Sequence, residues 1–180
     1  MRLGLAIALI TVGFALPASG QAVSYLPILD HRDQPSLTLT SGFEHLVLSG
    51  RKSSDRTSSE PGAFADLAFG LPASDEGGEG ILGLRIGTGP DEGTRLVAPY
   101  LAYRVFAGYD EWKTFFDIGA FARLLPVWGA GARLGVGVQY ELSENAGLFV
   151  ATGGSAAYGD GLQVGFDVGL GLQLRFGDPG

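Results

Sequence analysis

Histidine and serine together can act as a general base and a nucleophile. The only histidines are His31 and His45, and Ser49 follows His45 by four residues. On a β-strand four residues span about 13 Å, whereas a nucleophile and its base must lie about 3 Å apart. We therefore assign His45 a structural role and His31 a place in a solvated linker. The sequence predicts no catalytic residue and no enzyme.

Acidic residues form the second group that could do chemistry. Carboxylates suited to calcium occur in segments rich in glycine and proline, at Asp75, Glu76, Glu79, Asp91 and Glu92. Their spacing lacks the Asp-x-Asp-x-Asp-Gly pattern of a calcium loop, which favours solvated turns. The glycines between residues 87 and 93 resemble a phosphate loop, but Pro90 and the absence of a following helix indicate a turn. We expect no metal and no cofactor.

The composition narrows the class of protein further. The 180 residues include 30 glycines and no cysteine, with 46% hydrophobic and 17% charged residues. The missing cysteines exclude disulfides, thiol catalysis and cysteine-bound metals. With 12 basic residues against 19 acidic ones, nucleic acid is excluded as a partner. The length fits one domain, and the apolar content is too high for a disordered chain.

The first 22 residues have the three parts of a secretory signal peptide. A positive start at Met1-Arg2 precedes an uncharged apolar run from Leu3 to Leu16, and small residues follow Pro17. The run is shorter than the ~20 residues of a membrane-spanning helix. We predict a signal peptide over 1–22, cleaved after Ala22 or alternatively after Gly20, and a periplasmic linker over 23–35.

The rest of the chain predicts antiparallel strands. Eight segments with strand character are separated by turn residues. They are Ser36–Ser49, Ala63–Leu71, Gly80–Thr88, Arg95–Phe106, Lys113–Leu124, Trp128–Leu142, Gly147–Tyr158 and Leu162–Phe176. Most connections are shorter than the dozen residues that a parallel crossover needs. The fold class is therefore all-β, as an antiparallel meander.

Alternation within the strands predicts a transmembrane β-barrel. Every second residue from Leu162 to Phe176 is apolar, and the residues between them are glycine or polar. Such faces are long enough to cross a hydrocarbon layer of about 25 Å. Two places are irregular: Gly147–Tyr158 fits either register, and Pro99 must remove one ladder hydrogen bond, which suggests a bulge. We predict an eight-stranded up-and-down barrel over residues 36–180.

The same alternation assigns charged residues to the lumen. Five acids and five arginines fall on the face opposite the apolar one, which gives the interior a net charge of zero. They are Glu44, Asp66, Arg85, Arg104, Asp117, Arg123, Arg133, Glu141, Asp167 and Arg175. Because an unpaired buried charge is costly, we expect these residues to form a paired network.

Aromatic residues near strand ends favour a membrane barrel over a soluble one. Trp128, Tyr140 and Tyr158 occupy the places where membrane proteins put interfacial aromatics. A soluble barrel with an apolar lumen remains an alternative, although its outer surface would consist mainly of glycine with few charges.

With its signal peptide, eight alternating strands and final aromatic residue, the chain resembles the small outer-membrane barrels of the OmpA/OmpX type. The resemblance covers residues 36–176 and concerns pattern, since the sequences do not align. The segment Gly169–Phe176 is similar to the signal by which the outer-membrane assembly machinery recognises such proteins, with Gly171, Leu174 and Phe176 as its key positions. Four residues follow Phe176, whereas the family pattern ends there. The resemblance implies a bacterial outer-membrane location, with the lipid bilayer, lipopolysaccharide and that machinery as partners.

These observations predict a structural or surface-interaction role for a barrel whose lumen is plugged by its charge network. An eight-stranded barrel is just wide enough for side chains to fill, which disfavours an open pore. A lipid-modifying enzyme is a second hypothesis, but the sequence does not assemble serine, histidine and an acid near one rim. A secreted soluble lipid-binding barrel is the third.

Overall fold

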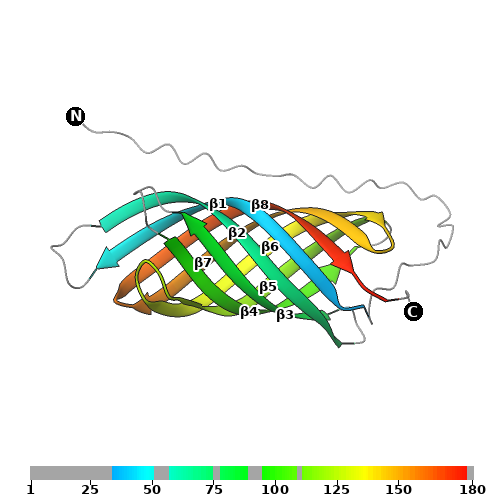
Figure 1. Cartoon of the computed structure of the whole chain (residues 1–180), viewed down its shortest axis with the longest axis horizontal. Coiled ribbons are helices and arrows are strands. Elements are labelled where there is room, and N and C mark those ends of the chain that lie inside the picture. The colour runs from blue at the N-terminus through cyan, green and yellow to red at the C-terminus, as the bar shows by residue number, and fades with distance from the viewer. Residues whose placement is uncertain (1–33, 51–56, 75–77, 89–94, 109–110, 178–180) are drawn as a thin grey trace.

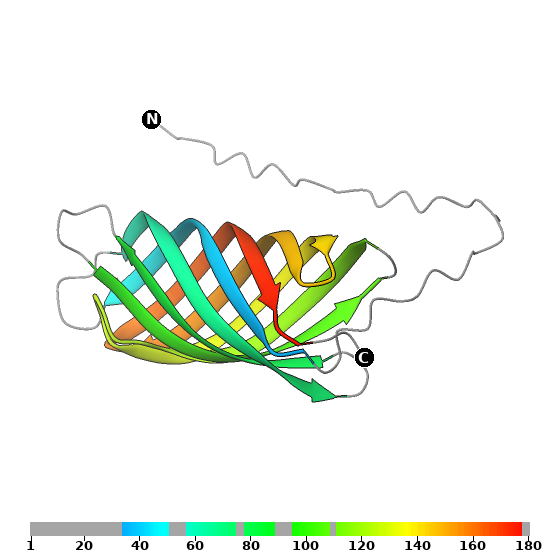
Figure 2. The same cartoon turned by 45° about the vertical axis from the view of Figure 1, so that its right-hand side comes forward.

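The chain forms a closed antiparallel β-barrel. The computed structural model describes residues 34–50, 57–74, 78–88, 95–108 and 111–177. The strands are β1 (Ser36–Gly50), β2 (Thr57–Ser74), β3 (Gly78–Thr88), β4 (Arg95–Ala107), β5 (Trp112–Arg123), β6 (Gly129–Ser143), β7 (Ala146–Gly159) and β8 (Gly161–Arg175). Each strand pairs with its neighbour in sequence, and β8 pairs with β1, as Figures 1 and 2 show. The predicted fold class is confirmed.

The predicted signal peptide over 1–22 lies outside the described residues, as does all of the linker except Gln34 and Pro35. No helix in the described ranges is long and apolar enough to cross a membrane.

The strand register sets the tilt and width of the barrel. Following paired residues once round the sheet from Thr38 leads back to β1 at Leu48, a stagger of ten residues. Stagger and strand number together fix the tilt of the strands and the diameter of the barrel. With only eight strands, the interior is narrow enough for side chains to fill.

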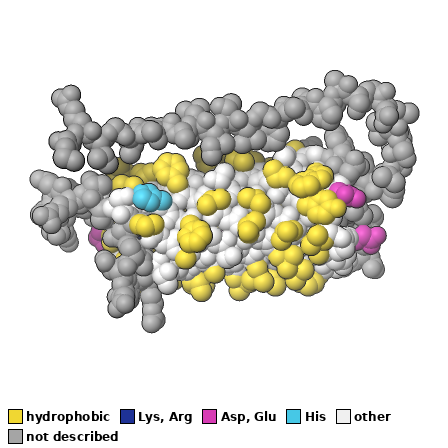
Figure 3. Space-filling model, turned by 90° about the horizontal axis from the view of Figure 1, so that it is seen from above, with side chains coloured by type: hydrophobic (Ala, Val, Ile, Leu, Met, Phe, Trp, Pro, Cys, Tyr) yellow, Lys and Arg dark blue, Asp and Glu magenta, His cyan; other side chains and the backbone are white. Residues whose placement is uncertain are grey.

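Apolar side chains cover the outside of the barrel. Leu, Val, Ile and Phe residues on all eight strands are exposed, among them Phe43 at 71% and Phe166 at 63%. The space-filling view shows hydrophobic side chains spread along the length of the barrel on one side (Figure 3). The register that the sequence left open is resolved in β7, where Phe149 is buried in the lumen and Leu148 and Val150 face outward. The reversed faces of a soluble barrel are therefore excluded.

Two segments interpreted as loops belong to strands. β2 begins at Thr57 and not at Ala63, because its first residues pair with the end of β1, where Ser49 faces Thr57. Backbone pairing along the long β1 thus overrides the weak strand preference of serine, proline and glycine. β3 likewise begins at Gly78, which places Glu79 in the lumen and not in a solvated turn.

Pro99 lies within β4 without shifting its pairing with β3, where it faces Leu84. It is the pairing of β4 with β5, on the other side of the strand, that is interrupted. Pairing with β5 runs from Tyr100 to Ala107, and beyond Pro99 only Val97 pairs again, with Leu125. The expected local irregularity is therefore a break in the β4–β5 ladder.

Candidate functional site

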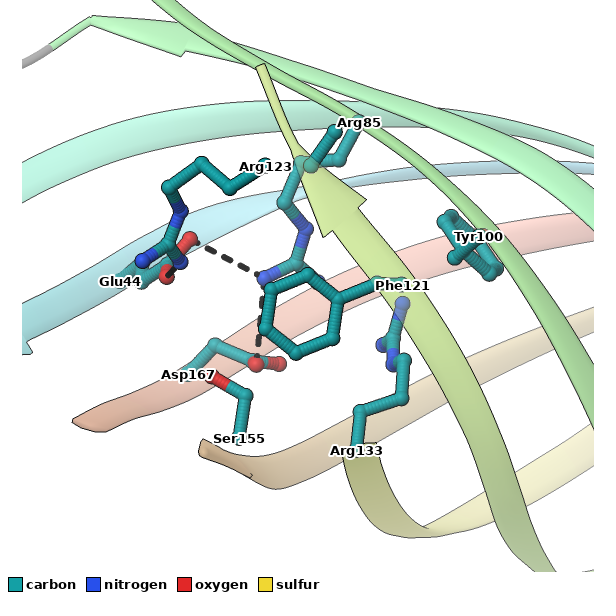
Figure 4. Close-up of a pocket in the computed structure, with 9 residues that line it drawn as sticks. Glu44, Arg85, Tyr100, Phe121, Arg123, Arg133, Ser155 and Asp167 are labelled. Atoms are coloured by element: carbon teal, nitrogen blue, oxygen red, sulfur yellow. Dashed lines mark hydrogen bonds and ion pairs between the residues drawn. The ribbon is translucent and has the colours of Figure 1, made fainter. Parts of the chain in front are cut away.

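The centre of the lumen holds an arginine bound to three carboxylates. Arg85 on β3 donates two hydrogen bonds to Asp66 on β2, at 2.8 and 3.0 Å. Its Nη1 also lies 3.2 Å from Glu44 on β1 and 3.1 Å from Asp167 on β8 (Figure 4). The ring of Phe64 covers the guanidinium at 3.8 Å. One side chain thereby links four strands.

A second arginine extends this network towards one end of the barrel. Arg123 donates from Nη2 to Glu44 at 2.7 Å and from Nη1 to Gln163 at 2.8 Å. Gln163 in turn donates to the carbonyl of Trp128 at 3.0 Å. Arg123 and Gln163 are both buried. Hydrogen-bonded side chains therefore fill the lumen near the start of β8.

A third arginine is held by one carboxylate and two aromatic rings. Arg104 on β4 donates to both oxygens of Asp117 on β5, at 2.7 and 2.9 Å. The rings of Phe115 and Phe149 lie 4.1 and 5.6 Å from its guanidinium carbon. Its Nη1 has no hydrogen-bond partner among the described residues. The aromatic rings compensate part of that loss through cation–π attraction.

The opposite end of the lumen is filled by a polar cluster. Arg175 donates to both oxygens of Glu141 at 2.7 and 2.9 Å, and Lys113 lies 3.3 Å from the same carboxylate. Gln173 donates to Glu79 at 3.1 Å. Three glutamines are fully buried in the lumen. Gln139 and Gln173 lie at this end, and Gln163 lies at the end described above.

Arg133 is bound differently from the other lumen arginines. Its guanidinium carbon lies 4.5 Å from the centre of the Tyr100 ring. It forms no ion pair with any carboxylate in the described part of the chain, the nearby Asp167 being bound by Arg85. The prediction that Arg133 has a charged partner is therefore wrong for the described residues. Alternation along a strand shows which face a residue is on, but not which residues lie opposite it across the lumen.

All ten charged residues that were predicted to face the lumen do face it, and all of them except Arg133 form ion pairs. Two lumen charges were missed. Glu79 was placed in a turn, and Lys113 stands at the first inward position of β5. With these two, the lumen side chains that the structure describes comprise six acids and six bases. The net charge of zero is retained.

Two small cavities lie between the described side chains of the lumen, and each has room for only a few water molecules. Their volumes are about 40 and 20 Å³, and a single water needs roughly 10–15 Å³. Four residues line both cavities and so stand between them: Arg85, Tyr100, Arg133 and Asp167. Figure 4 shows them around the smaller cavity.

The remaining predicted positions lie at the barrel ends and in β8. Trp128 and Tyr158 are exposed at one end, at 53% and 63%. Tyr140 lies towards the other end, where its ring packs 4.9 Å from Trp112 and its hydroxyl donates to Glu111. In the predicted assembly signal, Gly171 faces the lumen beneath the Phe149 ring, and Leu174 and Phe176 lie on the outer face.

His45 lies on the outer face of β1 and contacts a serine that the sequence did not suggest. Its Nε2 is 2.7 Å from Ser59 Oγ on β2. Ser49, the serine considered from the sequence, stands at the end of the same strand. Ser59 was missed because its segment was interpreted as a loop.

The described residues contain no group of three or more His, Asp or Glu side chains that could hold a metal ion. Of the acids considered for calcium, Glu79 lies in the lumen, and Asp75, Glu76, Asp91 and Glu92 lie outside the described residues.

Comparison with known proteins identifies the fold. No model of a protein family matches the sequence, and no curated protein matches it. The structure is similar to Neisserial surface protein A, with a TM-score of 0.58, 11% identity, and coverage of 78% of this chain and 97% of that one. It is also similar to the N-terminal β-barrel domain of Pseudomonas aeruginosa OprF, with a TM-score of 0.51, 14% identity, and coverage of 78% and 97%. OprG from the same organism gives a TM-score of 0.50 and 13% identity, with coverage of 84% and 100%. The chain therefore has the fold of the small eight-stranded outer-membrane barrels.

Proposed function

We propose that this protein is an outer-membrane barrel with a structural or surface-interaction role, exported by its first 22 residues. The bilayer and lipopolysaccharide surround it, and its lumen does not conduct solutes. The observation that carries the proposal is the combination of an apolar exterior with an interior filled by paired charges.

The packing of the lumen supports a closed barrel. A solute crossing it would have to separate the buried pairs of Arg85, Arg104, Arg123 or Arg175 from their carboxylates. Leaving one buried charge without its partner costs about 3–5 kcal/mol. Cavities of about 40 and 20 Å³ are too small for a metabolite. The same packing argues against the lipid-binding alternative, which requires an apolar cavity of ligand size.

Fractionation tests the location. We expect the mature protein in the outer-membrane fraction, with different gel mobility in unboiled and boiled samples, because a closed barrel leaves no strand edge for detergent to attack. Recovery of the protein in the soluble periplasm, without a mobility difference, would contradict the proposal.

Conductance in planar bilayers tests the closed lumen. Wild-type protein should give no steady ion current. A Tyr100→Ala, Arg133→Ala variant should also give no steady current. It joins the two cavities, but the hydrogen-bonded side chains around Arg123 and Arg175 still fill both ends of the lumen. The outward-facing Leu134→Ala variant is the control and should remain closed as well. A steady current through the wild-type protein would refute the plug.

Orientation is tested by labelling single cysteines on intact cells. With both barrel ends of the chain in the periplasm, the β7–β8 connection faces the medium and the β6–β7 connection faces the periplasm. An impermeant maleimide should label Asp160→Cys and spare Asn145→Cys; both residues are exposed. The opposite pattern would invert the topology.

A further inference from the structure

The outer face of the barrel carries a polar pair in apolar surroundings. His45 and Ser59 are both exposed, and their side chains meet across the β1–β2 pairing. In the register, His45 faces Pro61 on one side and Phe166 on the other.

The distance within the pair fits a nucleophile and its base. The 2.7 Å between Ser59 Oγ and His45 Nε2 is a hydrogen-bond distance suited to proton transfer. When the ring proton is on Nδ1, the serine hydroxyl donates to Nε2. Three apolar residues on the outer face, Phe43, Val47 and Phe166, lie next to the pair in the strand register.

The position of the pair selects a class of substrate. Ser59 is the third residue of β2, about 7 Å along the strand from its start. Trp128 and Tyr158, the exposed aromatics of the same barrel end, mark the level of the membrane interface. Ester bonds of membrane lipids lie at that level, between head groups and acyl chains. Phe43 and Phe166, both strongly exposed beside the pair, form the wall along which an acyl chain would pack.

We propose that Ser59 and His45 form a catalytic dyad that hydrolyses acyl esters of membrane lipids at the outer surface of the barrel. Ser59 Oγ attacks the ester carbonyl carbon while His45 Nε2 takes the serine proton. The bond to the alcohol oxygen breaks, and His45 gives the proton to that oxygen. Water, activated by His45, then hydrolyses the acyl-serine, so the products are a fatty acid and a deacylated lipid.

A catalytic dyad at this place departs from the sequence-based expectation that the protein is not an enzyme. That expectation depended on the pair His45 and Ser49, which the strand spacing separates. The dyad is also independent of the plugged lumen, since it lies on the lipid-facing side.

The test uses the full mature protein folded into vesicles of phosphatidylethanolamine and phosphatidylglycerol. A fluorophosphonate probe should label Ser59, as identified by peptide mass, and the vesicles should release fatty acid. Ser59→Ala and His45→Gln should lower the release at least tenfold, since a general base contributes about 10²–10⁴-fold. Ser49→Ala is the matched control, an exposed serine on the same face that should leave the release unchanged.

Heat-dependent gel mobility establishes that each variant is folded. The proposal is overturned when folded wild-type protein releases no more fatty acid than Ser59→Ala. It is also overturned when the probe labels another residue and Ser59→Ala keeps full activity.

Discussion

Arg85 and Arg133 are two lumen arginines in contrasting surroundings. Arg85 has three carboxylate partners within 3.2 Å and is buried to 7% exposure. Arg133 lies over the Tyr100 ring and has no carboxylate partner in the described lumen. The first position is fixed by ion pairs from three neighbouring strands, and the second by one aromatic contact. The stabilisation that a buried arginine receives therefore depends on which side chains face it across the lumen.

Replacing Arg85 gives the largest expected effect. Arg85→Met leaves Asp66, Glu44 and Asp167 close together, and only Glu44 keeps an arginine partner, in Arg123. We expect a loss of about 3–5 kcal/mol in the free energy of unfolding. Urea unfolding of the protein in vesicles measures this loss. A change below about 1 kcal/mol would show that Arg85 is no better held than a surface charge.

An arginine on the lipid side provides a third environment, without any polar partner. Val136 is the midpoint of β6 and is 53% exposed on the outer face. Val136→Arg should cost about 2–4 kcal/mol if that position lies at the bilayer midplane. Val136→Leu is the control and should stay within about 0.5 kcal/mol. Equal stability of the two variants in vesicle unfolding would remove the lipid-facing assignment of β6.

Replacing Arg133 should have a smaller effect than replacing Arg85. Arg133→Met removes a cation–π contact worth about 0.5–2 kcal/mol and keeps most of the side-chain volume. We expect a loss of about 1 kcal/mol in the same unfolding assay. A loss as large as that of Arg85→Met would mean that Arg133 has a carboxylate partner after all, and the contrast between the two arginines would fail.

The smallest expected effect concerns the tyrosine beneath Arg133. Tyr100→Phe keeps the ring and should change stability by less than about 0.5 kcal/mol. Tyr100→Leu removes the ring and should cost about 1 kcal/mol through the lost cation–π contact. A double-mutant cycle with Arg133→Met separates that contact from packing, and a coupling energy of zero would contradict it.

Alternation of apolar residues was sufficient to predict the fold from the sequence. It identified all eight strands and placed the charged residues of the lumen on the correct face. The period of a strand, however, contains no information on stagger, so the contact between Glu44 on β1 and Arg123 on β5 was not foreseeable.

Residues near strand ends were also missed, for a related reason. Ser59 and Glu79 lie in stretches rich in serine, glycine and acids, which favour turns when judged locally. Their strand conformation comes from pairing with β1 and β4 along the whole length of the sheet. The ends of such strands are set by pairing with the partner strand, and the local sequence pattern does not contain that information.

Closure of β8 onto β1 has a consequence for how the barrel is made. The two strands pair along fifteen residues, and Glu44 and Asp167 face each other across this seam. Arg85 joins both carboxylates, so its full set of partners exists only after the first and last strands have met. An open sheet entering a bilayer would present these carboxylates to lipid, where unpaired charges are costly. Insertion and closure are therefore expected to occur together, with the pairing of β1 and β8 formed before the barrel reaches its final depth.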